Sequence, residues 1–162
     1  MAFAGSPTST PQHARDIVGP MRDPSDPTLQ FFNFSYTHGA GAGVGEVNLR
    51  QLPPGKWQIV CAKSRVQTDA AFVATSDLHV GFRACQDQYG RALAADDNAF
   101  ANNLDVGAGA VDTAFAMPAG DYPGITEPIL QSPTGVIIYA MIDTANIQDT
   151  NQINGWIAAR PG

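Results

Sequence analysis

Three histidines are the residues of this sequence best suited to acid–base or metal chemistry: His13, His38 and His79. His13 lies in a proline-rich leader, His38 precedes a run of glycines, and His79 falls in a segment that alternates like a strand. No G-x-S-x-G motif marks a nucleophilic serine, and no Cys or His spacing matches a zinc site. We therefore expect no catalytic residue, and we interpret His79 as a histidine of a surface or an interface.

The densest group of carboxylates is formed by Asp96, Asp97 and Asp105. Several carboxylate oxygens close together would suit Ca²⁺. The spacing lacks the alternation and the closing glutamate of an EF-hand loop. We favour a structural role, in which these side chains cap and solvate a short helix over residues 94–104. The sequence predicts no bound metal and no cofactor.

Exposed aromatic side chains would be the means of holding a sugar, and the candidates are Trp57, Trp156, Tyr89 and Tyr122. Both tryptophans lie within strand-like segments, so we expect them in the core or at a subunit interface. Both tyrosines lie in loops beside Gly or Pro.

The elements that must position these residues are mostly strands. The chain of 162 residues has 16 Gly and 12 Pro, and Asp outnumbers Glu thirteen to two, a composition typical of turns rather than exposed helices. Eight segments have the pattern of short strands separated by turns: 29–36, 45–49, 56–63, 65–75, 76–84, 110–118, 134–142 and 153–161.

The clearest alternation is in residues 76–84, where Leu78, Val80 and Phe82 point one way and His79 the other, as in a half-buried strand. Phe100 and Leu104 stand four apart, which predicts the one helix, from Ala94 to Leu104. Residues 119–133 and 143–152 have the composition of loops. The predicted fold class is all-β, an antiparallel β-sandwich or jelly roll with one short helix.

The leader, residues 1–28, holds five of the twelve prolines and has too few apolar side chains to fold alone. We therefore divide the chain into an extended N-terminal arm, 1–28, and a β-sandwich body, 29–162. An extended peptide of this kind becomes ordered by lying on another surface. The predicted partner-binding residues of the arm are three apolar anchors and two flanking cations: Ile17, Val18, Met21, Arg15 and Arg22.

Charge and apolar content limit the classes of partner. The net charge is −6 and the nine Lys and Arg residues are scattered, which argues against nucleic acid. No apolar run approaches the roughly 20 residues that span a bilayer, and no signal-peptide pattern is evident, so we expect no membrane partner. For Cys61 and Cys85 we favour two free, buried thiols, with a disulfide as the open alternative.

Three stretches carry a resemblance: Leu52 to Ile59 (LPPGKWQI), Thr75 to Gly81, and the polar run from Asp87 to Asp97. With the later GVIIYAMI and GWIAAR strands, they make residues 47–160 resemble small virion proteins of tailed bacteriophages. The resemblance rests on a loose pattern rather than on a single motif.

The resemblance implies a head decoration (cement) protein with a β-sandwich body and no catalytic residues. Such a protein, made in the host cytoplasm and located on the capsid surface of the virion, would form a homotrimer that braces neighbouring major capsid protein subunits. The arm would dock on those subunits. Two alternatives stay open: a carbohydrate- or receptor-binding β-sandwich of a phage fibre or bacterial surface, and an enzyme on a jelly-roll barrel such as a cupin.

Overall fold

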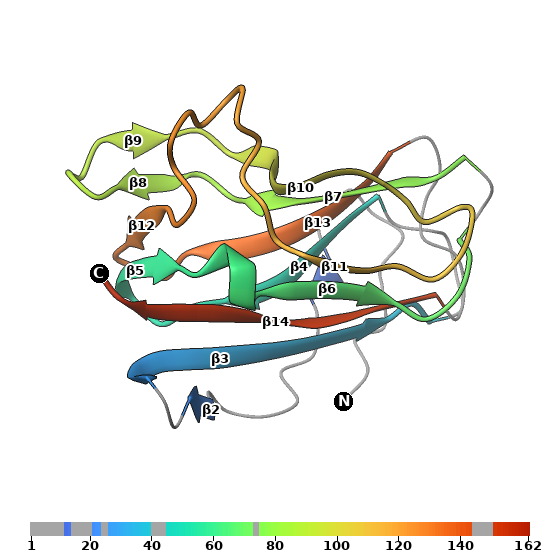
Figure 1. Cartoon of the computed structure of the whole chain (residues 1–162), viewed down its shortest axis with the longest axis horizontal. Coiled ribbons are helices and arrows are strands. Elements are labelled where there is room, and N and C mark those ends of the chain that lie inside the picture. The colour runs from blue at the N-terminus through green and yellow to red at the C-terminus, as the bar shows by residue number, and fades with distance from the viewer. Residues whose placement is uncertain (1–11, 14–20, 24–25, 40–44, 73–74, 144–150) are drawn as a thin grey trace.

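The computed structural model describes residues 12–13, 21–23, 26–39, 45–72, 75–143 and 151–162, and in them the chain is all-β (Figure 1). These residues form fourteen strands and one 3₁₀ turn, η1 (Cys61–Lys63). The strands are β1 (Gln12–His13), β2 (Met21–Asp23), β3 (Asp26–Thr37), β4 (Glu46–Gln51), β5 (Gly55–Ile59), β6 (Arg65–Thr68), β7 (Asp77–Phe82), β8 (Cys85–Asp87), β9 (Ala92–Leu93), β10 (Asp96–Asp105), β11 (Asp112–Ala114), β12 (Ile129–Ser132), β13 (Ile137–Asp143) and β14 (Gln152–Pro161). No helix in these residues is long and apolar enough to cross a bilayer.

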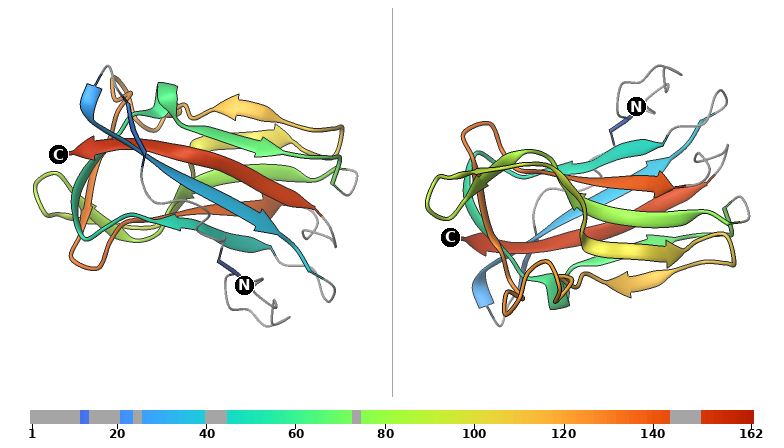
Figure 2. Two further views of the ribbon diagram at one scale, coloured as in Figure 1. Left: turned by 90° about the horizontal axis from the view of Figure 1, so that it is seen from below. Right: turned by 90° about the horizontal axis from the view of Figure 1, so that it is seen from above.

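The strands make two sheets that pack face to face, so the predicted all-β sandwich is confirmed (Figure 2). The smaller sheet has the order β1-β4-β13-β7-β10. In the larger sheet, β14 is central: it pairs with β3 on one side and with β5 and β6 on the other. All described pairings are antiparallel except that of β1 with β4. The jelly-roll topology stays a prediction.

Alternation along the strands builds the core. In β3, Phe32, Phe34 and Tyr36 are buried, as the aromatic alternation predicts. Leu78, Val80 and Phe82 of β7 face them from the other sheet and are at most 2% exposed. Phe100 contacts two aromatic rings in the core: the Phe82 ring edge-to-face, with centroids 6.0 Å apart, and the Phe115 ring in a stacked arrangement, with centroids 5.3 Å apart. These side chains hold the two sheets together mainly by apolar burial.

The predicted helix from Ala94 to Leu104 is wrong, because this segment forms the edge strand β10. Asp96 pairs with Phe82 and Ala101 pairs with Val80, so residues 97–100 stand opposite Gly81 alone. The bulge turns Phe100 into the core, where it is fully buried. Gly81 is required for it, because a Cβ at this position would collide with the backbone carbonyl of Asp96.

Two further predictions need correction. Residues 119–133 are not all loop, because Ile129–Ser132 form β12 between β5 and β8. The predicted exposure of His79 is also wrong, since this side chain is only 6% exposed. Its Nδ1 lies 3.1 Å from Oδ1 of Asn102 in β10, so the bulged edge strand covers this face of β7.

Candidate functional site

The described parts of the arm attach to the edges of both sheets. Gln12 and His13 of β1 pair in parallel with β4, at the edge of the smaller sheet. Met21–Asp23 of β2 pair antiparallel with β3, at the edge of the larger sheet. Main-chain strand pairing of this kind is how an extended peptide adds to an exposed edge.

Of the predicted arm residues, Met21 and Arg22 stand opposite Phe31 and Gln30 of β3. Their side chains lie outside what is described, and so do Arg15, Ile17 and Val18 entirely. The anchoring roles of these five side chains therefore stay predictions.

The outer edge of β3 is longer than the strand that covers it. β2 pairs with β3 only at Asp26, Gln30 and Phe31, whereas β14 follows β3 from Gln30 to Thr37. Along residues 32–37, no strand of the described chain pairs with this outer edge. The edge is partly blocked by Arg50 of β4, whose Nη1 donates to the carbonyl of Asn33 at 3.2 Å. Such an edge is a template for a strand of another chain.

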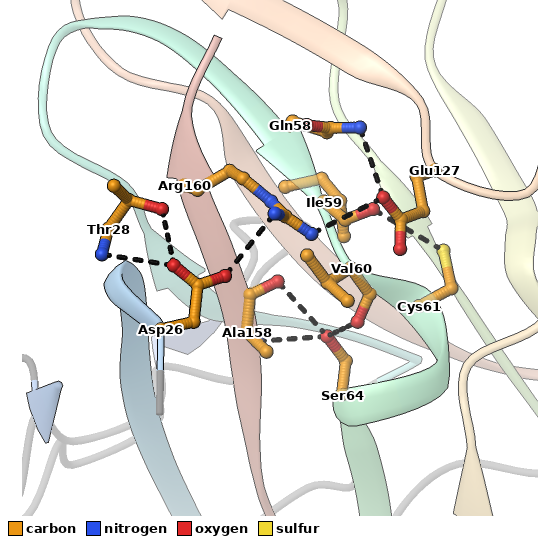
Figure 3. A network of polar contacts seen from close by, with 10 residues as sticks. All are labelled: Asp26, Thr28, Gln58, Ile59, Val60, Cys61, Ser64, Glu127, Ala158 and Arg160. Carbon is orange, nitrogen blue, oxygen red and sulfur yellow. Dashed lines mark hydrogen bonds and ion pairs between the residues drawn. The ribbon is translucent and has the colours of Figure 1, made fainter. Parts of the chain in front are cut away.

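A polar network around Arg160 joins the start of β3 to the end of β14 (Figure 3). Arg160, near the end of β14, lies 3.3 Å from Oδ2 of Asp26 and 3.6 Å from Oε2 of Glu127. Gln58 of β5 donates to the same oxygen of Glu127 at 3.0 Å. The side-chain hydrogen bond from Thr28 lowers the pKa of Asp26, with Arg160 adding to the effect, so the ion pair is charged at neutral pH. Asp26 therefore belongs to the body's polar framework.

Ser64 closes η1 onto β14 on the same side of the molecule (Figure 3). Its Oγ donates to the carbonyl of Val60 at 3.0 Å and accepts from the backbone N–H of Ala158 at 2.9 Å. Ser64 is fully buried. Its hydroxyl is therefore used in hydrogen bonds with backbone groups and is not exposed to a substrate.

Cys61 and Cys85 are both free, as the favoured interpretation predicts, and Cys61 is buried whereas Cys85 is half-buried. Burial raises the pKa of Cys61 to about 12, with the nearby charge of Glu127 adding to the rise. Burial raises the pKa of Cys85 to about 11. Because the thiolate is the reactive form, neither thiol is an activated nucleophile.

We expect both thiols to be alkylated slowly by iodoacetamide at pH 8. A thiol with a pKa near 11 is about one part in a thousand thiolate at this pH, against about a quarter for a free cysteine. Alkylation of Cys85 in the native chain should thus be at least about 100-fold slower than in urea, as peptide mass spectrometry would measure. Equal rates in the native and unfolded chain would contradict the raised pKa values.

The raised pKa values of the two thiols also make the stability of the fold depend on pH. The folded pKa lies above the unfolded one, so on raising the pH the unfolded chain loses its thiol protons first. The contribution of the two thiols to the free energy of unfolding is therefore fully present below about pH 8.5. It is lost as the pH rises to 11 to 12.

A recess lies between the β8–β9 hairpin and the segment 117–128. It has a volume of about 540 Å³, and its apolar lining includes Phe82, Leu93, Met117 and Leu130. Tyr89, 74% exposed, and Ile125, 47% exposed, also line it. They are the two large apolar side chains that the described residues expose. We call this recess the hairpin groove.

One carboxylate builds the turn that presents Tyr89. Oδ1 of Asp87 accepts the backbone N–H groups of Tyr89 and Arg91, each at 2.9 Å, and Oδ2 accepts Nε of Arg91 at 2.6 Å. Desolvation acts to raise the pKa of Asp87, but hydrogen bonds from Arg91 and Tyr89 outweigh it and lower the pKa. Gly90 supplies the positive φ of +82° that the turn requires. The Arg91 guanidinium lies 5.2 Å from the centre of the Tyr89 ring.

Tyr122 fixes the opposite wall of the groove. Its hydroxyl donates to Oδ2 of Asp96 in a short hydrogen bond. Burial, followed by this bond, raises the pKa of Tyr122, so the phenol stays neutral. The backbone N–H of Ile125 donates to the carbonyl of Tyr122 at 3.1 Å. Tyr122 is therefore an anchor of the loop, and Tyr89 is the exposed ring.

The remaining candidates are not assembled into a reactive site. Asp96 and Asp105 lie at opposite ends of β10 and accept backbone N–H groups of Asn98 and Ala108. The predicted helix-capping role of these carboxylates is wrong, because there is no helix to cap. Within the described ranges, no three His, Cys, Asp or Glu side chains gather to hold a metal ion.

The tryptophans are structural. Trp57 is 7% exposed and packs edge-on against Phe32, which confirms the predicted core position. Its Nε1 donates to the carbonyl of Pro53 at 2.8 Å. Trp156 is half-buried, and its Nε1 donates to the carbonyl of Lys63 at 2.7 Å. Tyr89 alone of the four candidate aromatics is largely exposed.

No family model matches the chain, and neither a curated protein nor a solved structure matches it at a significant level.

Proposed function

We propose that this chain is a structural component of a tailed-bacteriophage virion: a head decoration (cement) protein that binds the outer surface of the major capsid shell. The resemblance of residues 47–160 supports this proposal, and so does the β-sandwich body. The protein acts by binding rather than by catalysis. Its two thiols are protonated at neutral pH, in keeping with a structural protein.

The observation that carries the proposal is the attachment of the arm to sheet edges. β1 pairs two residues with β4, and β2 pairs three with β3. Pairings this short bury little surface and contribute little stability. These two described pairings therefore cost little to exchange for the edge of a neighbouring subunit.

The outer edge of β3 gives the assembly a place for self-association. Within the described residues, no strand pairs with the outer edge of residues 32–37 beyond the end of β2. In the proposed homotrimer, this edge can take a strand of a second copy, while the arms dock on the major capsid protein. Many copies on one shell make weak individual contacts effective through avidity.

Removal of residues 1–25 tests the arm. The cut is placed before Asp26 because Asp26 pairs with Arg160 and accepts hydrogen bonds from Thr28. The truncated chain should keep its thermal unfolding transition but lose at least about 90% of the co-sedimentation with phage particles that the intact chain shows.

A chain lacking only residues 1–11 is the matched control, because it keeps β1, β2 and all five predicted docking residues. It should bind particles like the intact chain. Full binding by the folded 1–25 truncation would refute the arm mechanism. Failure of the intact chain to bind any particle would refute the decoration role itself.

The second candidate function is a carbohydrate- or receptor-recognising module of a phage fibre or bacterial surface. The hairpin groove favours it, because the exposed large apolar side chains Tyr89 and Ile125 gather there. Ligand binding by an isolated chain that does not bind particles would favour this second function over the first.

A further inference from the structure

We propose that the hairpin groove is a binding site for a neutral saccharide. The inference rests on the second candidate function, recognition at this groove, and it is independent of arm docking. Its occupant is defined by four properties of the lining: shape, charge balance, hydrogen-bonding capacity and rigidity.

The shape suits a small ligand. A volume of about 540 Å³ lies within the range of small-molecule sites. Of the apolar residues that line the groove, Phe82 and Leu130 are buried and Leu93 is half-buried, whereas Tyr89 is largely exposed. Aromatic rings with one apolar body and one polar tip suit ligands that have both kinds of surface. A sugar ring has an apolar C–H face and a rim of hydroxyl groups, and so matches this combination.

The charges of the groove are already balanced within the protein. Asp87 is paired with Arg91 at 2.6 Å, and Glu127 lies 3.6 Å from Arg160. An anionic ligand would share Arg91 with Asp87, and a cationic ligand would share Glu127 with Arg160, so an ion of either sign would meet a counter-charge that is already neutralised. A neutral ligand needs no counter-charge.

Polar groups with hydrogen-bonding capacity remain along the groove. Both described contacts of Glu127 use Oε2, which leaves Oε1 as an acceptor. The Arg91 side chain is 74% exposed and uses Nε for Asp87, so its terminal nitrogens remain donors. Gln88 and Thr126 also line the groove and add an amide and a hydroxyl. A purely apolar peptide segment would desolvate these groups without replacing their hydrogen bonds.

The wall that carries Tyr89 is already in place. Gln131 of β12 donates to the carbonyl of Asp87 at 2.8 Å, which fixes the hairpin to the sheet. On the other wall, the Tyr122–Asp96 hydrogen bond holds the loop. A preformed site spends less binding free energy on ordering its own residues.

Calorimetric titration of the intact chain with neutral trisaccharides (maltotriose, cellotriose, mannotriose and triacetylchitotriose) tests the proposal. We expect saturable binding of at least one of them with a Kd of about 1 mM or tighter. Tyr89→Ala should weaken it at least about tenfold, and Tyr89→Phe less than about threefold, because the ring provides the stacking surface. Tyr89 is exposed, so both variants should unfold at the same temperature as the unaltered chain.

Arg91→Ala and Arg65→Ala form a matched pair of variants. Each removes an arginine from a surface ion pair with an aspartate, at 2.6 and 2.7 Å, but Arg65 does not line the groove. Arg91→Ala should weaken saccharide binding at least about threefold, and Arg65→Ala should leave it unchanged.

Three results would overturn the proposal. The first is no saturable binding of any of the four sugars at about 10 mM. The second is binding that Tyr89→Ala leaves intact, and the third is tighter binding of sialyllactose or inorganic phosphate than of the neutral sugars. None of these three results would contradict the decoration role, because the co-sedimentation of the Tyr89→Ala chain with particles is measured separately.

Discussion

Gly81→Ala is expected to destabilise the fold by about 3–5 kcal/mol, or to prevent folding altogether. The Cβ of alanine would collide with the carbonyl group of Asp96 and with the carbonyl carbon of Asp97. All three of these atoms belong to the backbone and are therefore unable to move as a side chain can. Relief would require the bulge of residues 97–100 to move away from β7, and Phe100 would then leave the core. The measurement is the free energy of unfolding in urea.

Gly109→Ala is the control for this substitution. A Cβ at Gly109 would have no heavy atom within 4 Å, so the change should alter stability by no more than about 0.5 kcal/mol. Equal, small effects of both substitutions would contradict the bulge of β10 over Gly81.

Phe100→Ala is expected to cost about 3–5 kcal/mol of stability. The Phe100 ring is fully buried and lies 5.3 Å from the ring of Phe115 and 6.0 Å from that of Phe82. Its removal leaves a cavity between the sheets that backbone-paired neighbours are unable to fill.

Leu104→Ala is the comparison that separates a strand from a helix. On a helix, Phe100 and Leu104 would share one face and both would be buried. In β10, Leu104 is only partly buried, so its truncation should cost about 1–2 kcal/mol. Equal losses at the two positions would favour the helix and contradict the strand.

The strands of the body were largely predictable because their signal is local. Alternation in 29–36 and 76–84 reports directly which side chains face the core, and Phe32, Phe34, Leu78 and Val80 are all buried. The segment 94–104 was not predictable in this way. An irregular strand loses its period of two at a bulge, and the Phe100–Leu104 spacing then imitates a helix.

The burial of His79 and the formation of β12 both depend on contacts between segments that are distant in the sequence. Alternation places His79 on the outer face of β7, where the side chain is nevertheless buried and contacts Asn102 of the returning strand β10. Ile129–Ser132 has no alternation and lies between two prolines, so its pairing with β5 and β8 has no local signal.

One wall of the hairpin groove could be predicted from the sequence, and the other could not. The run DQYGR has the composition of a tight turn, and it places Tyr89 at an exposed tip. Nothing local indicates that the loop with Ile125 lies across from that tip, because the two are brought together by β8 and β12.

The most direct measurement of the central proposal is the protein composition of purified phage particles. Quantitative mass spectrometry of particles that have passed through a density gradient should find this chain in many copies, at a fixed ratio to the major capsid protein. Particles that contain none of it, while the infected-cell lysate does, would contradict a place in the shell.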